Sequence, residues 1–238
     1  MSDESRLERL YVDVRGSGPP IVLTHGLGDS SRTWDALRGA LSEFRSVAWD
    51  LPGHGRSEQP EEPEAYSRDI ALADLKALID STWVDPAAGR DAATGKDVVL
   101  VGHSLGGYLT QCHAVAQPAG LRALVLIATG PGFSDPERRE RWNRYVRRAA
   151  DRFDIPAAAT RLGEQHDDRV MANLAQLDVP VLQICGERDD GYHAAMALLE
   201  RKVRSVESKL VAGAGHHPHV SHVDEVADTI RKFLARLP

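Results

Sequence analysis

The chain has 238 residues, of which 42% are hydrophobic and 27% charged, a composition typical of a folded domain and unlike that of a disordered chain. Its 29 Lys and Arg against 35 Asp and Glu give a formal net charge of −6. This charge disfavours a general nucleic-acid-binding protein, because phosphate contacts need a basic surface. Two cysteines cannot make a disulfide framework and suit a reducing compartment.

The N-terminal segment Met1–Leu10 has no apolar run of the kind found in secretory signals. The longest nearly apolar stretch, Leu121–Gly130, contains Arg122 and is too short to span a bilayer. We therefore expect a cytoplasmic protein with neither a membrane nor a nucleic acid as partner. The sequence leaves the oligomeric state open.

Short apolar runs without period-2 alternation recur along the chain, which is typical of strands covered on both faces of a parallel sheet. In chain order these runs are Ile21–Leu23, Ser46–Asp50, Asp97–Val101, Ala123–Ala128, Val179–Cys185 and Ser208–Val211. A weakly alternating run, Leu10–Val14, precedes them and predicts an edge strand.

Helical patterns separate most of these runs, at Thr33–Ser42, Tyr66–Thr82, Leu105–Gln117, Asp190–Val203 and His222–Arg236. The alternation predicts an α/β protein whose doubly wound, mostly parallel sheet is flanked by helices. The segment Asp85–Lys96 is rich in Ala, Gly and Asp, and we expect a surface loop there.

Residues 131–178 interrupt this alternation of strands and helices. We expect them to have secondary structure of their own, because structureless loops of that length are uncommon in compact domains. Within them, 135–152 is the best helical stretch, and it places Trp142, Tyr145, Val146 and Ala149 on one apolar face. We expect a core made of residues 1–130 and 179–238, with 131–178 inserted as a small helical lid.

The most informative segment is Gly102-His103-Ser104-Leu105-Gly106, which lies between a predicted strand and a predicted helix. A sharp turn between the two would hold Ser104 in a strained conformation with its hydroxyl exposed, as suits a nucleophile. Side chains at Gly102 and Gly106 would collide with the neighbouring strand and helix. A serine that merely caps the helix is the alternative interpretation.

With this turn, the sequence resembles the α/β-hydrolase family over nearly the whole chain, from Tyr11 to Phe233. The resemblance implies that the loop His25–Gly28 contributes one oxyanion-hole N–H, from Leu27, and that Leu105 contributes the second. It implies a structural role for His25. The loop Asp50–Ser57 resembles the family's scaffold loop, so we expect no acid–base role for its Asp50 and His54.

A serine nucleophile needs a base, and the family places that base in a Gly-His turn before the final helix. His216 follows Gly215 in such a turn, and His217 is the runner-up. A histidine-rich tract can also bind metal. Because His216, His217 and His219 have no cysteine or carboxylate set near them in the sequence, we predict no metal site.

The base needs an acid that fixes its tautomer, and Asp189 matches the family's acid at the end of a buried strand. Asp190, Glu187 and the more distant Asp135 are the alternatives. The order Ser104, Asp189, His216 is the one expected of this fold.

Aromatic side chains are expected to supply the apolar walls of a substrate pocket, and they are Trp34, Phe133, Trp142 and Tyr145. Arginines crowd residues 138–152. They are consistent either with a solvated helix whose arginine stems cover apolar surface, or with one or two side chains, such as Arg141 and Arg144, that pair with an acidic substrate group.

Together these features predict a serine hydrolase that needs no cofactor and cleaves a small-molecule carboxylic ester of small to medium acyl size. The same triad serves thioesterases, lactonases and carbon–carbon bond hydrolases, and the sequence does not separate them. A non-catalytic ligand-binding protein on the same scaffold is the alternative from another class.

Overall fold

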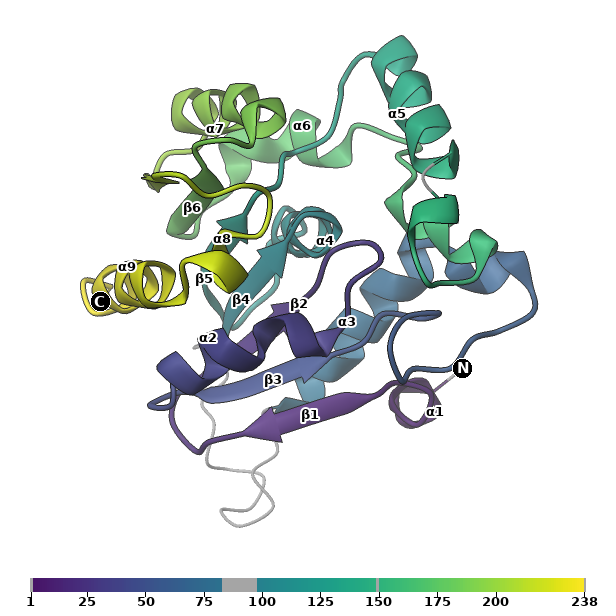
Figure 1. Ribbon diagram of the computed structural model, residues 1–238, viewed down its shortest axis with the longest axis horizontal. Coiled ribbons are helices and arrows are strands. Elements are labelled where there is room, and N and C mark those ends of the chain that lie inside the picture. Colours follow the sequence, from purple (N-terminus) through teal and green to yellow (C-terminus); the bar gives the residue numbers. More distant parts are fainter. Residues whose placement is uncertain (1, 83–97, 149, 238) are drawn as a thin grey trace.

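A computed structural model describes residues 2–82, 98–148 and 150–237. A seven-stranded sheet in the order β1-β3-β2-β4-β5-β6-β7 runs through the molecule (Figure 1). Strand β1 is antiparallel to its neighbour β3, and every other neighbouring pair is parallel. The predicted fold class and the predicted edge strand are thereby confirmed.

The strands lie close to the predicted apolar runs. They are β1 (Val12–Arg15), β2 (Pro20–Thr24), β3 (Arg45–Trp49), β4 (Val98–His103), β5 (Leu121–Ile127), β6 (Val181–Gly186) and β7 (Val206–Val211). The site depends mainly on β4 and β6, whose carboxyl ends meet at the same edge of the sheet because the two strands run in the same direction.

Helices follow most of the strands and cover both faces of the sheet. The α-helices are α1 (Asp3–Leu7), α2 (Asp35–Ala40), α3 (Arg68–Thr82), α4 (Leu105–Ala114), α5 (Pro136–Arg148), α6 (Arg169–Asn173), α7 (Asp190–Lys202), α8 (Pro218–Ser221) and α9 (Val223–Leu234). Short 3₁₀ turns are η1 (Ser31–Trp34), η2 (Pro63–Tyr66), η3 (Ala150–Arg152), η4 (Ala157–Gly163) and η5 (Leu174–Gln176).

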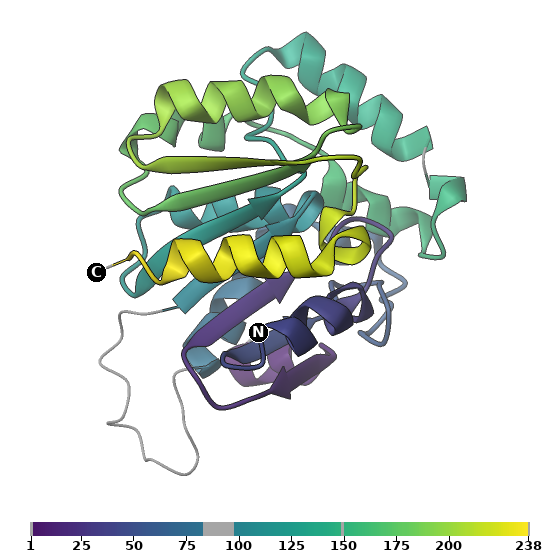
Figure 2. The ribbon, with the colours of Figure 1, turned by 60° about the vertical axis from the view of Figure 1, so that its left-hand side comes forward.

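Side chains of the central strands alternate between two cores, one on each face of the sheet. In β4, Val98 and Leu100 face the core shared with α3, α4 and α7, whereas Val99 and Val101 face the core shared with α2 and α9. Figure 2 shows α2 and α9 side by side in front of the sheet. Because both faces are covered, the central strands β4 and β5 carry apolar residues at most successive positions, which explains the absence of period-2 alternation there.

Residues 131–178 contain α5, η3, η4, α6 and η5, between β5 and β6. Figures 1 and 2 show α5 at the end of the sheet toward which the parallel strands point. The predicted apolar face of α5 is confirmed at Val146, which is buried, and is wrong at Tyr145, which is 55% exposed. Ala149, also predicted on that face, lies outside the described residues. Asn143, which was not predicted, is buried too, and two hydrogen bonds with the Gln165 backbone satisfy its side chain.

Two further expectations concern segments outside the core. The predicted surface loop Asp85–Lys96 lies outside the described residues. Among the residues that are described, none of the helices combines the length and the apolar character needed to cross a membrane.

Phe233 tests the packing of α9 on the sheet, because its ring is 2% exposed within the second core. We expect Phe233→Ala to lower the free energy of unfolding by about 3–5 kcal/mol, since the ring leaves a cavity. The neighbouring Lys232→Ala, at a side chain that is 72% exposed, should change it by at most about 0.5 kcal/mol. Urea unfolding of both variants measures the difference, and equal losses would contradict this packing.

Candidate active site

Ser104 lies in the turn between β4 and α4 and has φ 49° and ψ −114°. A positive φ is uncommon for a residue with a side chain, so the surrounding structure must hold this backbone in place. The Ser104 N–H donates to the Ile127 carbonyl (3.0 Å), and the Thr129 hydroxyl donates to the Ser104 carbonyl (2.7 Å). The turn is therefore fastened to β5 and the residues that follow it.

The glycines on either side of Ser104 are required by close backbone approach. A Cβ atom at Gly102 would lie 2.5 Å from the Cα of Gly107, and one at Gly106 would overlap the Thr24 carbonyl. Side chains at Gly102 and Gly106 would thus collide with backbone, as the sequence predicted. The glycines let the start of α4 press against β2, which leaves Ser104 at the apex of the turn.

His216 and Asp189 are brought together from the loops that follow β7 and β6. The His216 Nδ1–H donates to Asp189 Oδ2 over 2.8 Å. The main chain supports this approach, because the Arg188 N–H donates to the Ala214 carbonyl (2.9 Å). In this arrangement Nε2 is the ring atom of His216 that remains able to accept a proton.

The alternative acids are engaged elsewhere. The Asp190 side chain is 92% exposed and lies near His193. Glu187 accepts a hydrogen bond from the Gly213 N–H (2.7 Å), so it braces the loop that carries His216. Asp135 accepts two backbone N–H bonds at the start of α5. Of these four carboxylates, Asp189 is the one that contacts the His216 ring.

The runner-up base, His217, points to a different carboxylate. Its Nε2 lies 3.3 Å from Asp29 Oδ2. His103, the neighbour of Ser104, donates from Nε2 to the His216 carbonyl (2.9 Å). That hydrogen bond joins the end of β4, and with it the serine turn, to the turn that carries His216.

Tyr192, in the first turn of α7, is a site residue that sequence reasoning missed. Its ring stacks on the His216 imidazole, with centroids 5.2 Å apart and planes 26° from parallel. Burial raises the pKa of Tyr192 to about 12, although a hydrogen-bonding contact with the Ser104 side chain acts in the opposite direction. The only signal in the sequence is an aromatic residue three positions after Asp189, at a helical spacing.

The two expected oxyanion-hole donors are main-chain N–H groups at the serine turn and in the loop after β2. Of the hydrogen bonds seen in the described residues, none uses the N–H of Leu27 or Leu105. Leu105 is the first residue of α4, where helix geometry leaves the N–H without an intrahelical acceptor. A role for both N–H groups as oxyanion-hole donors stays a prediction.

His25, His54 and Asp50 hold loops, in agreement with the expected scaffold roles. The His25 Nε2 accepts from the Leu51 N–H (3.0 Å), so its Nδ1 carries the proton and donates to the Gly26 carbonyl (2.7 Å). The Asp50 carboxylate accepts from two backbone N–H groups. Burial lowers the pKa of His54 to about 3, which keeps that ring neutral.

The four aromatic residues expected to line the substrate pocket lie in different environments. Trp34 is fully buried in the core, and its ring packs against His219. Phe133 and Trp142 lie against each other with ring centroids 6.1 Å apart, and Tyr145 packs on the other side of Trp142 (5.7 Å). A pocket role for these four residues stays a prediction, and Trp34 is the one whose surface is entirely covered.

The α5 arginines pair mainly with acidic residues of their own segment. Arg141 lies 3.9 Å from Glu137 and Arg144 lies 3.5 Å from Glu140, and both arginine side chains are at least half exposed. This arrangement favours a solvated helix over arginines aimed at a substrate. The idea that Arg141 or Arg144 binds an acidic group gains no support from these contacts.

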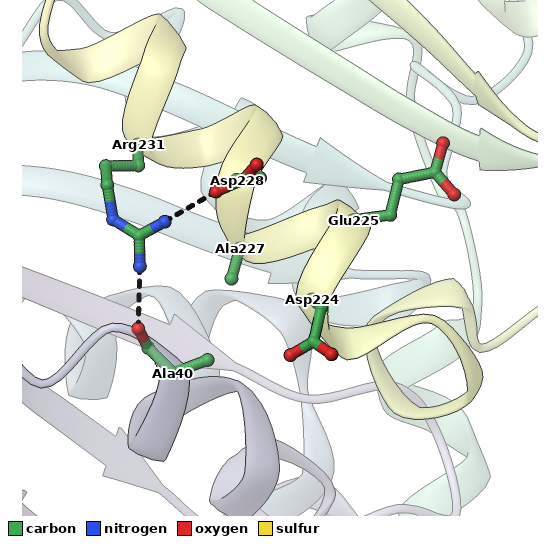
Figure 3. A pocket seen from close by; sticks show the side chains of 6 residues that line it. All are labelled: Ala40, Asp224, Glu225, Ala227, Asp228 and Arg231. Atoms are coloured by element: carbon green, nitrogen blue, oxygen red, sulfur yellow. Dashed lines mark hydrogen bonds and ion pairs between the residues drawn. The ribbon is translucent and has the colours of Figure 1, made fainter.

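A surface hollow between α2 and α9 is lined by none of the expected site residues (Figure 3). Arg231 crosses it, donating to the Ala40 carbonyl and to Asp228, each over 2.8 Å. The two other acidic residues that line the hollow, Asp224 and Glu225, lie in the first turn of α9. The hollow contains no nucleophile, so we do not assign the chemistry to it.

Comparison with known proteins shows which family and which relatives this chain resembles. A family model described as "Alpha/beta hydrolase family" matches residues 21–229. The pimeloyl-(acyl-carrier protein) methyl ester esterase of Xanthomonas campestris pv. campestris (strain B100) is 31% identical over 96% of this chain and 100% of its own. A Bacillus subtilis (strain 168) relative, named for 2-succinyl-6-hydroxy-2,4-cyclohexadiene-1-carboxylate synthase activity, is 25% identical over 91% of this chain and 90% of its own.

A solved structure gives the same picture of the fold. A thermophilic esterase from Thermogutta terrifontis superposes with a TM-score of 0.80 at 24% identity, covering 95% of this chain and 93% of that one. At that identity the likeness concerns the fold alone.

The neutral state of buried His54 predicts a pH dependence of stability. The pKa of His54 in the folded chain, about 3, lies below the unfolded value of about 6.5, so the unfolded state binds more protons between these values. The contribution of His54 to the free energy of unfolding is therefore complete above pH 6.5 and is lost as the pH falls. We expect a loss of about 2 kcal/mol between pH 8 and pH 5.

Urea unfolding of wild type and His54→Gln at pH 8 and pH 5 measures this loss. Glutamine does not titrate and can still donate to the Pro52 carbonyl that His54 contacts. The variant should therefore lose less stability than wild type on acidification. Identical pH dependences in the two proteins would show that His54 charges freely in the folded state.

Proposed function

The chain belongs to the alpha/beta hydrolase family, and from this premise we propose that it hydrolyses carboxylic esters with Ser104, His216 and Asp189 as catalytic residues. The observation that carries this proposal is the 2.8 Å hydrogen bond between His216 and Asp189. His103, which ends β4 next to Ser104, donates to the His216 carbonyl and so connects this pair to the serine turn. No other acidic residue considered as the partner of His216 makes such a bond to its ring.

The proposed reaction has two halves. The Ser104 hydroxyl attacks the ester carbonyl while His216 Nε2 takes its proton, and the imidazolium then returns this proton to the departing alkoxide. Water, deprotonated by the same imidazole, attacks the acyl-enzyme and releases the acid. Asp189 holds the His216 ring in the required tautomer and stabilises its charged form.

Charge develops on the carbonyl oxygen in both halves, and we assign its stabilisation to the N–H groups of Leu27 and Leu105. Each such donor, when it is already oriented, lowers the free energy of the transition state by about 3–4 kcal/mol. The N-terminus of α4 adds a favourable dipole at the same place.

Tyr192 is proposed as a positioning residue that acts through the triad. Its ring stacks on the His216 imidazole, and its hydroxyl lies near enough to the Ser104 side chain for that group to oppose the rise in its pKa. In the described residues the Ser104 hydroxyl makes no hydrogen bond to His216. Such bonds often tighten only when substrate is bound, and Tyr192 holds both partners close together before that step.

We propose esters of small to medium acyl size as substrates, with Phe133, Trp142 and Tyr145 as apolar contacts. These rings form a contiguous aromatic row on and before α5. The Xanthomonas relative is named for a methyl ester esterase, which supports an ester rather than a thioester, a lactone or a carbon–carbon bond. Segment 131–178 would act as the lid over this pocket.

Removing the nucleophile is the direct test. We expect Ser104→Ala to abolish turnover of p-nitrophenyl acetate and butyrate and to leave the circular dichroism spectrum unchanged. A fluorophosphonate probe should label wild type at Ser104 with one equivalent and leave the variant unlabelled. Ester turnover that persists in the variant would exclude this mechanism, whereas tight ligand binding without turnover in wild type would favour a binding protein.

The role of Asp189 is tested against its exposed neighbour. Asp189→Asn should lower kcat by about 10⁴-fold, because the amide favours the wrong His216 tautomer. Asp190→Asn, one position along the chain, should stay within about twofold of wild type because its side chain faces solvent. Equal effects of the two substitutions on p-nitrophenyl butyrate hydrolysis would remove Asp189 from the triad.

Tyr192 offers a graded test of positioning. Tyr192→Phe keeps the ring and loses one hydroxyl contact, so kcat should fall by about 2- to 10-fold, the value of a net hydrogen bond. Tyr192→Ala also uncovers the His216 ring and should lower kcat further, with little change in KM. Tyr11→Phe is the matched control, at a tyrosine that is not part of the proposed site and whose ring packs against Arg56. A change in KM alone in the Tyr192 variants would indicate substrate contact instead.

A further inference from the structure

Three side chains from separate parts of the chain converge beside the His216 turn. Asp29 lies in the loop after β2, His103 ends β4, and His217 precedes α8. One potential ligand atom from each lies within 4.8 Å of the other two. Asp29 Oδ2 is 3.2 Å from His103 Nδ1 and 3.3 Å from His217 Nε2. The tertiary structure therefore supplies the carboxylate whose absence near the histidines argued against a metal site.

His103 presents its Nδ1 in the manner of a metal ligand. Its Nε2–H donates to the His216 carbonyl, as the second ring nitrogen of a ligating histidine usually does. The side chain is 1% exposed, and Nδ1 has no hydrogen-bond partner, so the nearby Asp29 oxygen does not satisfy it. A buried imidazole nitrogen without a partner is costly in a native structure, and a bound cation would satisfy it.

Gly26 keeps the space between two of these atoms clear. A Cβ atom built on Gly26 would lie 2.8 Å from His103 Nδ1 and 2.9 Å from Asp29 Oδ2. No side chain other than that of glycine would leave this approach open. The His217 side chain is 43% exposed, which gives an ion and its water a route from solvent.

The spacing fits a small tetrahedral ion. Bonds of 2.0–2.1 Å to nitrogen and oxygen place neighbouring ligands of tetrahedral zinc about 3.3 Å apart. The two distances from Asp29 Oδ2, 3.2 Å and 3.3 Å, match this edge, and the third pair, His103 and His217, lies within 4.8 Å, so that pair would need at most a small approach. Two imidazoles and one carboxylate also suit a borderline divalent ion better than Ca²⁺ or Mg²⁺, which prefer oxygen ligands.

We propose that Asp29, His103 and His217 bind one divalent transition-metal ion, Zn²⁺ being the best match, with water completing the coordination. The site does not depend on ester hydrolysis. An ion held there would connect the loop after β2, the end of β4 and the turn before α8, so its occupancy should raise the melting temperature.

Calorimetric titration of the chelator-treated, tag-free full-length chain with ZnCl₂ tests the proposal. We expect one ion per chain and binding weakened by roughly 10- to 100-fold or more in Asp29→Asn and in His217→Gln. Co²⁺ provides a second readout, because tetrahedral coordination gives intense visible absorption that both variants should lose. Neither readout uses enzyme activity.

Two control variants separate this site from other histidines. His166→Gln removes a side chain that is 61% exposed outside the cluster, and it should bind Zn²⁺ as wild type does. His216→Ala removes the neighbouring imidazole that pairs with Asp189 and should also retain the ion. Urea midpoints confirm that each variant is folded before its affinity is compared.

The proposal is overturned if wild type binds no Zn²⁺ below millimolar concentration, or if folded Asp29→Asn and His217→Gln bind it as tightly as wild type does. It is also overturned if His216→Ala alone abolishes binding, since the ion would then belong to the His216–Asp189 pair. Asp29 would in those cases be a hydrogen-bonding brace for His217.

Discussion

The hydrogen bond from the His103 ring to the His216 carbonyl joins two segments that are 113 positions apart in the chain. One segment carries Ser104 in a strained turn, and the other carries the imidazole that meets Asp189. His103 is fully enclosed, and burial lowers its pKa, so the link is made by a neutral ring in a rigid setting. This hydrogen bond, together with ring contacts from His103 to His216 and His217, holds the His216 turn against the end of β4.

The parallel sheet explains why such distant residues can meet at all. Strands β4, β5 and β6 end at one edge, so the loops that follow them share the same space. Two cores, one on each face, hold these strands rigidly, and the glycine contacts bring α4 close to β2. The packed strands and helices thus fix where the site lies, and the loops that follow the strands carry the site side chains.

Proteins with this fold catalyse more than one reaction, so membership of the family does not by itself identify the reaction. Relatives of this chain are named for a methyl ester esterase and for a synthase of 2-succinyl-6-hydroxy-2,4-cyclohexadiene-1-carboxylate. The residues of the individual site, and not the fold, must therefore decide the reaction. In this chain the Tyr192 ring over His216 and the aromatic row of Phe133, Trp142 and Tyr145 are the features that would shape the substrate.

The sequence by itself determined the strand–helix order, the strained serine turn and the candidates His216 and Asp189, because these features are written in local patterns and in short motifs. It could not place Tyr192 or Asp29. Their contacts depend on how α7 and the loop after β2 are oriented against the sheet, and no periodicity encodes that orientation. The same reason explains Tyr145, whose helical spacing indicated burial although the structure leaves its side chain 55% exposed.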